Sequence, residues 1–269
     1  MTNIKLVAVD LDGTLLASDS LLAQKGSRLL MKIAQLGVHV VICTTRNPDS
    51  AVAIADQLGL SDPLICSNGG QIWASPDGPI WIKYTIPIEV ARSIAEVADA
   101  NDWEMLTTID NQTYARARRD QAPIFRAKWG MVPTNLTAIT DDPIRMLVHQ
   151  PEAIVHLREL VQTDFADQAR TETYYRPDGS LNSLGIFPIQ ADKGTALRYV
   201  LDRLGIVPEQ TMTIGDNPND VPMIQTAGIG IAMGNAPKSV KQEATAIAPT
   251  NDDEGVAWAI KKYVLDAQI

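Results

Sequence analysis

Two aspartates two residues apart follow the first apolar run of the chain, and their spacing is typical of a site that binds a cation. Residues 4–9 form a run that is apolar except at Lys5, as expected for a buried strand of a parallel sheet. The run stops before Asp10 and Asp12, which are followed by Gly13 and Thr14. Ligands of open α/β sheets lie beyond the carboxyl ends of the strands, which is where this run ends. Side chains two residues apart on extended backbone lean the same way, so the two carboxylates need a cation or a shared proton. An Asp-rich turn without chemistry is the plain alternative.

Polar side chains follow two further apolar runs in the same manner. The stretch 44–46 (Thr-Thr-Arg) ends one run, the stretch 215–220 (Gly-Asp-Asn-Pro-Asn-Asp) ends another, and Lys193 opens a predicted helix between them. Asp216 offers a third carboxylate, and Mg²⁺ characteristically takes carboxylates, phosphate oxygens and water. Zinc would instead favour histidine or cysteine. The three strand ends therefore predict a magnesium site at one edge of the sheet.

The charge of these residues also constrains the substrate. Four aspartates (Asp10, Asp12, Asp216 and Asp220) against one Mg²⁺ and the Lys193 ammonium leave one negative charge before any substrate binds. A phosphate dianion therefore needs further hydrogen-bond donors, for which Thr44, Asn219 and N–H groups of the loops are suited.

The elements between these stretches predict a doubly wound α/β domain. A helical stripe over 22–36, a strand over 38–43, a helix opened by Pro48 and a strand over 64–66 repeat the strand and helix order of a parallel sheet. A turn sequence between two apolar runs predicts a hairpin over 71–83.

A different pattern interrupts this domain. Helices at 88–100 and 152–163, separated by paired strand candidates, predict an inserted α+β domain with a mostly antiparallel sheet. The parallel pattern resumes at Asp192, a suitable helix N-cap. The predicted fold class is α/β, a doubly wound, mainly parallel Rossmann-like sheet with an inserted α+β cap domain. The predicted bounds are 1–82 and 188–269 for the core and 83–187 for the cap.

Composition excludes several classes of function. The 269 residues carry a net charge of −9, which opposes non-specific binding to nucleic acid or to an anionic membrane. No stretch has the length of a membrane span or the pattern of a signal peptide, so we expect a cytoplasmic protein. Cys43 and Cys66 stand in apolar surroundings and are interpreted as buried thiols. The basic stretch 116–119 is interpreted as a solvated face. The oligomeric state is left open.

The polar stretches resemble the haloacid dehalogenase superfamily of phosphotransferases, in particular its Cof-type branch. Four motifs match in order over the whole chain, and the stretches 67–70 (Ser-Asn-Gly-Gly) and 233–236 (Met-Gly-Asn-Ala) match as well. The sequence departs from the family at Thr45, because the family usually has glycine at this position, in Thr-Gly-Arg. This difference affects how closely the backbone at residue 45 can approach a phosphate. The four motifs are Asp10-Leu11-Asp12-Gly13-Thr14, Thr44, Lys193-Gly194 and Gly215-Asp216-Asn217-Pro218-Asn219-Asp220.

The resemblance implies a mechanism and a role for each residue. Asp10 would attack phosphorus to form an aspartyl-phosphate, and Asp12 would protonate the leaving alcohol and then activate water. Mg²⁺ would be held by Asp10, by Asp216 and, through a backbone carbonyl, by Asp12. Phosphate oxygens would be bound by Thr44, Lys193, Asn219 and the backbone at Leu11 and Thr45, with Asp220, Arg46 and Asn68 in support.

Three functions follow from these residues. The first is a Mg²⁺-dependent hydrolase that removes phosphate from a small metabolite, a sugar or polyol phosphate. The second is a phosphomutase or phosphotransferase that uses the same intermediate. The third is a phospho-receiver signalling module, which the acid/base Asp12 and an insert of about a hundred residues both disfavour.

Overall fold

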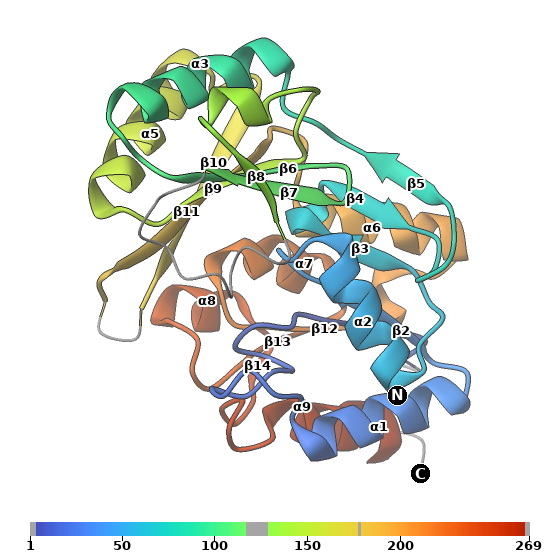
Figure 1. Cartoon of the computed structure of the whole chain (residues 1–269). Coiled ribbons are helices and arrows are strands. Elements are labelled where there is room, and N and C mark those ends of the chain that lie inside the picture. Colours follow the sequence, from blue (N-terminus) through green and yellow to red (C-terminus); the bar gives the residue numbers. More distant parts are fainter. Residues whose placement is uncertain (1–3, 117–128, 177–178, 267–269) are drawn as a thin grey trace. The chain divides into compact units, whose positions relative to one another are not determined.

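The computed structural model describes residues 4–116, 129–176 and 179–266, and the chain divides into two compact units (Figure 1). The core unit comprises Met1–Ile82 together with Asp192–Ile269, and the inserted unit comprises Lys83–Ala191. The core unit is therefore assembled from two segments that are distant in the sequence. The predicted α/β class with an inserted domain is confirmed.

The core unit is organised around an eight-stranded sheet in which β1 lies between β12 and β2. The six strands from β14 to β3 are parallel, and β4 runs antiparallel to β3. The carboxyl ends of three adjacent strands consequently lie at one edge, where the polar stretches begin. The order is β14 (Ala246–Ile247), β13 (Ile229–Ala232), β12 (Thr211–Gly215), β1 (Leu6–Val9), β2 (His39–Cys43), β3 (Leu64–Cys66), β4 (Gln71–Trp73) and β5 (Ile80–Lys83).

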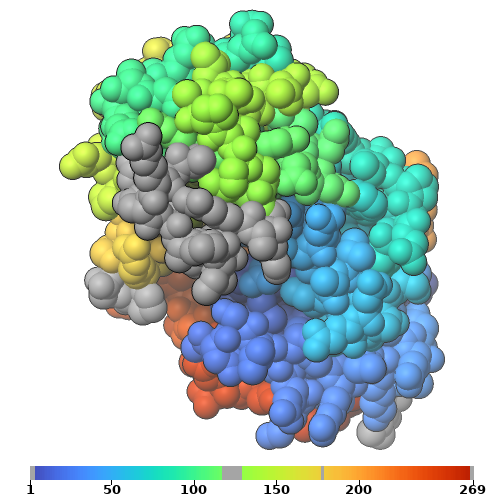
Figure 2. Space-filling view, viewed as in Figure 1, coloured from blue at the N-terminus to red at the C-terminus, as the bar shows by residue number. Residues whose placement is uncertain are grey.

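Helices cover both faces of this sheet because its strands are apolar on both sides. Alternate residues of β1 point to opposite faces: Val7 and Val9 pack under α1 (Gln24–Gln35), α2 (Pro48–Leu58) and α9 (Gly255–Ile260), whereas Leu6 and Ala8 pack under α6 (Lys193–Leu204). Helices α1 and α9 are neighbours, and Figure 2 shows blue N-terminal and red C-terminal residues side by side on the surface. Two short helices, α7 (Val221–Thr226) and α8 (Lys238–Glu243), follow β12 and β13.

Helices α2 and α6, which begin next to site residues, have typical capping residues at both ends. The Asn47 side chain accepts a hydrogen bond from the N–H of Ser50 at the start of α2, and the Asp192 side chain accepts one from Thr195 at the start of α6. Gly59 and Gly205 end these helices in the left-handed conformation. By contrast, α1 begins two residues later than its apolar stripe suggested. Its N-cap residue Ala23 has no capping side chain, and the distant Glu254 carboxylate accepts from the N–H groups of Lys25 and Gly26 instead.

The inserted unit contains the predicted mainly antiparallel sheet, covered on one face by α3 (Ile88–Ala100) and α5 (Pro151–Asp164). The three-residue strand β8 was not predicted, because so short a half-buried segment carries no clear alternation; it pairs in parallel with β7. Of the basic stretch 116–119, residues 117–119 lie outside the described part. The sheet order is β10 (Ala169–Tyr175), β11 (Leu181–Pro188), β9 (Arg145–Val148), β6 (Met105–Ile109), β7 (Gln112–Arg116) and β8 (Gly130–Val132).

The two cysteines are buried thiols, as predicted. Cys43 packs on the α6 face of the sheet and Cys66 on the α1 face, so the two side chains lie on opposite sides. Burial raises the pKa of both thiols, which removes the thiolate form that a nucleophile needs. Within the described ranges, no helix combines the length and the hydrophobicity that a membrane crossing requires.

Candidate active site

The sheet itself positions the first residues of the site. The N–H of Asp10 donates to the carbonyl of Ile214 at 3.0 Å, and the N–H of Thr44 donates to the carbonyl of Ile65 at 2.8 Å. Strand pairing therefore extends one residue past β1 and β2, and it fixes the backbone of both residues at the carboxyl edge. Asp10 and Thr44 are both buried there.

A buried lysine joins the two segments of the core unit. The Nζ atom of Lys193 donates to Oδ1 of Asp10 and to Oδ1 of Asp220, each at 2.6 Å, and the lysine is only 1% exposed. The other oxygen of Asp220 accepts from the N–H groups of Asp216 and Asn217, each at 2.9 Å. Asp220 therefore holds both the lysine and the turn after β12.

Burial sets the electrostatics of this group. Burial raises the pKa of Asp10, against the attraction of Lys193, and burial together with the nearby Asp220 raises the pKa of Asp216 to about 7. Burial lowers the pKa of Lys193, but Asp10 and Asp220 outweigh it and hold that pKa well above its ordinary value. Three buried carboxylates against one ammonium leave an excess of negative charge in a region of low dielectric.

The donor set fits a hard divalent cation. Carboxylate oxygens of Asp10, Asp216 and Asp220 lie within 4.8 Å of one another, and all three residues are buried. Asp220 is tied by the Lys193 ammonium and by two backbone N–H groups, whereas the oxygens of Asp216 accept only from neutral side chains, so Asp10 and Asp216 are the side chains best suited to hold the ion. Oxygen ligands of this kind are those that Mg²⁺ prefers.

Asp12 has a partner of its own. Its two oxygens accept from Nη2 and Nε of Arg46, at 2.6 and 2.9 Å, and its side chain is half exposed. Sequence spacing placed Asp10 and Asp12 on one side with a common need for a cation. In the structure each has a separate cationic partner, because a turn begins at Leu11 and Gly13 adopts φ +78°.

Three residues whose side chains contact Asp216 were absent from the predicted site, and one of them is its neighbour Asn217, whose Nδ2 donates to Oδ2 of Asp216 at 3.1 Å. The Thr14 hydroxyl donates to Oδ1 of Asp216 at 2.9 Å, and Nδ2 of Asn235 lies 3.4 Å from Oδ2 and donates to the carbonyl of Gly13 at 2.8 Å. A Cβ atom on Gly13 would lie 2.3 Å from Oδ2 of Asp216, so only glycine fits. The available signal was the stretch 233–236, which follows a buried strand and contains a lone asparagine.

The predicted phosphate-binding residues lie, like Asp10, beyond the carboxyl ends of the strands. Thr44 is buried and its Oγ1 accepts from the N–H of Arg46 at 3.1 Å, whereas Thr45 is half-buried. The Leu11 side chain belongs to the apolar core, so only its backbone is available to a ligand. Nδ2 of Asn219 donates to Oδ1 of Asn68 at 3.0 Å.

The sequence also matches known proteins along nearly its whole length. Residues 7–260 match the sequence family described as haloacid dehalogenase-like hydrolase. The chain belongs to this family. A haloacid dehalogenase-like hydrolase from Bacteroides thetaiotaomicron has a similar structure, with a TM-score of 0.85 and 27% identity over 97% of this chain and 99% of that one.

Curated relatives of this haloacid dehalogenase-like hydrolase are phosphatases. A 5-amino-6-(5-phospho-D-ribitylamino)uracil phosphatase of Bacillus subtilis is 32% identical to this chain. The aligned region covers 98% of this chain and 97% of the relative. A phosphoglycolate phosphatase of Methanopyrus kandleri is 29% identical over 96% and 97% of the two chains. The protein is thus a phosphoric monoester hydrolase of the Cof type, which favours the predicted hydrolase over the receiver alternative.

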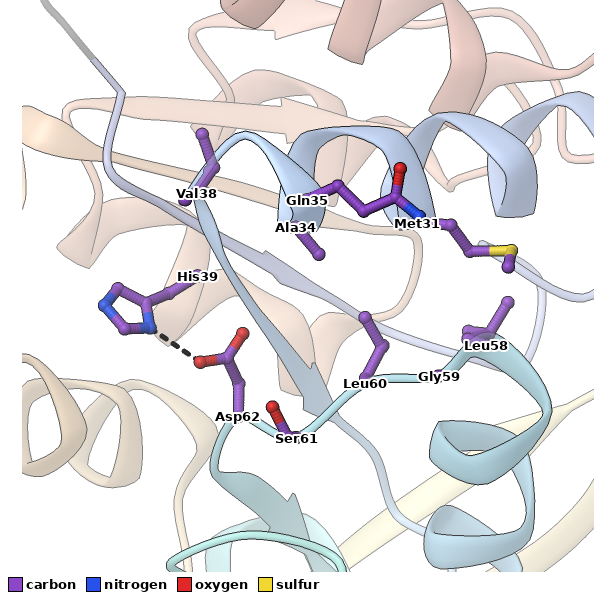
Figure 3. A pocket seen from close by; sticks show the side chains of 11 residues that line it. Met31, Ala34, Gln35, Val38, His39, Leu58, Gly59, Leu60, Ser61 and Asp62 are labelled. Carbon is purple, nitrogen blue, oxygen red and sulfur yellow. Dashed lines mark hydrogen bonds and ion pairs between the residues drawn. The ribbon is translucent and has the colours of Figure 1, made fainter.

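The hydrolase also has a pocket of about 340 Å³ at the opposite end of the strands (Figure 3). Asp62 lies there, and its carboxylate accepts from the N–H of Val40 at 2.7 Å and pairs with Nδ1 of His39 at 2.6 Å. Both bonds involve the first two residues of β2, whereas Thr44 follows the last residue of that strand. The pocket therefore lies at the amino ends of the strands, whereas Asp10 and Lys193 lie at the carboxyl ends, so it cannot receive a phosphate that these two residues bind.

Proposed function

We propose that this enzyme hydrolyses the phosphate ester of a small metabolite, a sugar or polyol phosphate, with Mg²⁺ and through an aspartyl-phosphate. The observation that carries the proposal is the buried Asp10, which contacts Lys193 and has a carboxylate oxygen within 4.8 Å of one of Asp216, while Asp12 lies two residues away with its own partner. One carboxylate is therefore suited to attack phosphorus, and the second to transfer protons.

The names of the relatives support the substrate class. Three relatives from Bacillus subtilis, between 26% and 32% identical, are named phosphatases of 5-amino-6-(5-phospho-D-ribitylamino)uracil. That compound is the phosphate ester of a polyol chain. We infer that this enzyme acts on a substrate of the same class, in which the phosphate is attached to a primary or secondary alcohol.

The proposed reaction has two balanced steps. An oxygen of Asp10 forms a bond to phosphorus as the bond to the alcohol oxygen breaks, and Asp12 gives that oxygen a proton. Asp12 then takes a proton from water, which attacks phosphorus and releases inorganic phosphate and free Asp10. Arg46 donates one bond to each oxygen of Asp12, and the second lone pair of either oxygen would remain available for the transferred proton.

The remaining residues hold the phosphate and its charge. When bound by Asp10 and Asp216, Mg²⁺ would neutralise charge on the phosphate oxygens. Lys193 balances the charge of Asp10, and Asp220 keeps Lys193 in place through its second contact. Thr44, Asn219 and backbone N–H groups would donate to the phosphate oxygens.

The proposal is tested with a set of phosphorylated metabolites and Mg²⁺, following released phosphate. We expect sugar or polyol phosphates to be hydrolysed without an added acceptor, activity to disappear on exhaustive chelation, and Mg²⁺ to restore it. Ca²⁺ should not restore it, because it prefers more ligands at longer distances. Full activity after chelation, or activity only with a sugar acceptor, would contradict the proposal.

Thr44 and Thr45 should respond differently to substitution. Thr44→Val removes the hydroxyl but keeps the shape, so we expect the KM to rise about 10-fold, the usual loss for a hydrogen bond to a charged group. Thr45→Gly gives the backbone the freedom that the family usually has, so we expect activity to be kept or raised. Steady-state kinetics on one substrate check both variants, and equal small effects would remove Thr44 from the site.

A further inference from the structure

We propose that Asn68 is a positioning residue, which orients the amide of Asn219 for phosphate binding. This inference rests on the proposed function. It also concerns the turn at residues 67–70, here called the Asn68 turn, which follows β3 and contacts three segments that would bind phosphate. The residues of these segments are Thr44, Asn219 and Lys193.

The Asn68 turn has a backbone that most residues avoid. Ser67, Asn68 and Gly69 adopt φ values of +50°, +60° and +90°, three left-handed residues in succession. Two of them carry side chains, for which this conformation is unfavourable. The bend allows the N–H of Ser67 to donate to the carbonyl of Arg46 at 2.8 Å, and that of Asn68 to donate to the carbonyl of Thr44 at 3.0 Å. The turn therefore holds the segment after β2 at two points, Thr44 and Arg46.

The Asn68 side chain reaches the segment after β12. Its Oδ1 accepts from Nδ2 of Asn219 at 3.0 Å, and the two residues are 1% and 6% exposed. An amide side chain can otherwise rotate and exchange its oxygen with its nitrogen. The acceptor on Asn68 fixes the nitrogen of Asn219 and leaves its second N–H for a ligand. A rotated amide would instead present its oxygen, which repels a phosphate.

The same turn lies against the residue that precedes Lys193. A Cβ atom on Gly69 would be 2.5 Å from the backbone carbonyl oxygen of Asp192, so the two backbones are in close contact. The strained turn thus contacts all three segments, and only Asn68 among its residues bonds Asn219 through a side chain. Because Asn68 makes this side-chain bond, it is the residue of the turn to substitute.

The first test is Asn68→Gly, assayed by competitive inhibition of p-nitrophenyl phosphate hydrolysis by inorganic phosphate. Glycine keeps the left-handed backbone and removes only the amide. We expect the inhibition constant of phosphate and the KM to rise about 5- to 10-fold, with kcat nearly unchanged. A merely structural role would lower the folded fraction and hence the apparent kcat, but would leave the inhibition constant unchanged, and that result would overturn the proposal.

A matched control is Ser20→Gly, at an exposed residue of the core unit with φ +64°. It makes the same backbone change where no ligand is bound, so it should leave the inhibition constant of phosphate and the kcat as they are. An equal rise of that constant in Ser20→Gly would attribute the effect to the backbone and overturn the role of the Asn68 amide.

The second test combines Asn68→Gly with Asn219→Ala. If Asn68 acts through Asn219, the double variant should bind phosphate as Asn219→Ala alone does; effects that multiply would overturn the proposal. An unchanged inhibition constant in Asn219→Ala would overturn it too, because the oriented amide would then not bind phosphate. Failure of the proposed function is distinguishable, since the unmodified enzyme would then hydrolyse no phosphate ester with Mg²⁺.

Discussion

Asp10→Asn is expected to abolish phosphatase activity, with a loss of about four orders of magnitude or more. The amide has nearly the shape of the carboxylate but cannot attack phosphorus, so neither a phosphoenzyme nor product should form. Lys193 keeps its contact with Asp220, at 2.6 Å, so the ammonium still has one buried carboxylate beside it and the fold should survive. The measurement is the mass of the protein after mixing with substrate and quenching with acid.

An unfolding experiment provides the control for this variant. Asp10→Asn should show a cooperative unfolding transition, so that its inactivity is chemical rather than a consequence of unfolding. A covalent phosphate adduct on a folded Asp10→Asn enzyme would overturn the assignment of the nucleophile, because the modified residue would then lie elsewhere.

Asp12→Asn is expected to slow the enzyme by about 10² to 10⁴, and by an amount that depends on the leaving group. The variant retains Asp10 but has no proton donor or base. An alkoxide of high pKa needs a proton as it leaves, whereas p-nitrophenolate does not. Transfer from a sugar phosphate should therefore suffer far more than transfer from p-nitrophenyl phosphate, and the ratio of the two kcat/KM values measures the difference.

The same variant should accumulate the phosphoenzyme, since water then lacks its base. The acid quench described for Asp10→Asn would detect this species in Asp12→Asn with p-nitrophenyl phosphate. Arg46 loses part of its bidentate contact, so Arg46→Lys is a matched comparison that disturbs the contact but keeps the acid. Equal losses with both leaving groups in Asp12→Asn would contradict the acid/base role.

Much of the fold follows from local patterns in the sequence. The aliphatic and β-branched runs 6–9 and 211–214 predict buried parallel strands, and Asp192 and Gly205 bound α6 as helix caps do. The strand β8 could not be predicted in this way, because its place depends on pairing with β7 rather than on its own three residues.

Residue types at the ends of predicted strands indicate which chemistry is available. Carboxylates after β1 and β12, a threonine after β2 and a lysine at the start of α6 must meet at one edge, because neighbouring parallel strands end on the same side of a sheet. Residue types and the alternating strand and helix pattern were enough for that conclusion.

The partner of each side chain, by contrast, is known from the folded structure and not from the sequence pattern. The Asp12 side chain pairs with Arg46, Asn235 reaches Gly13 and Asp216, and Asn68 meets Asn219 across 151 residues of sequence. Such pairs depend on a single turn conformation or on the packing of distant segments, and neither is encoded in spacing along the chain. Local pattern determines where backbones run, whereas side-chain contacts are decided when the segments pack.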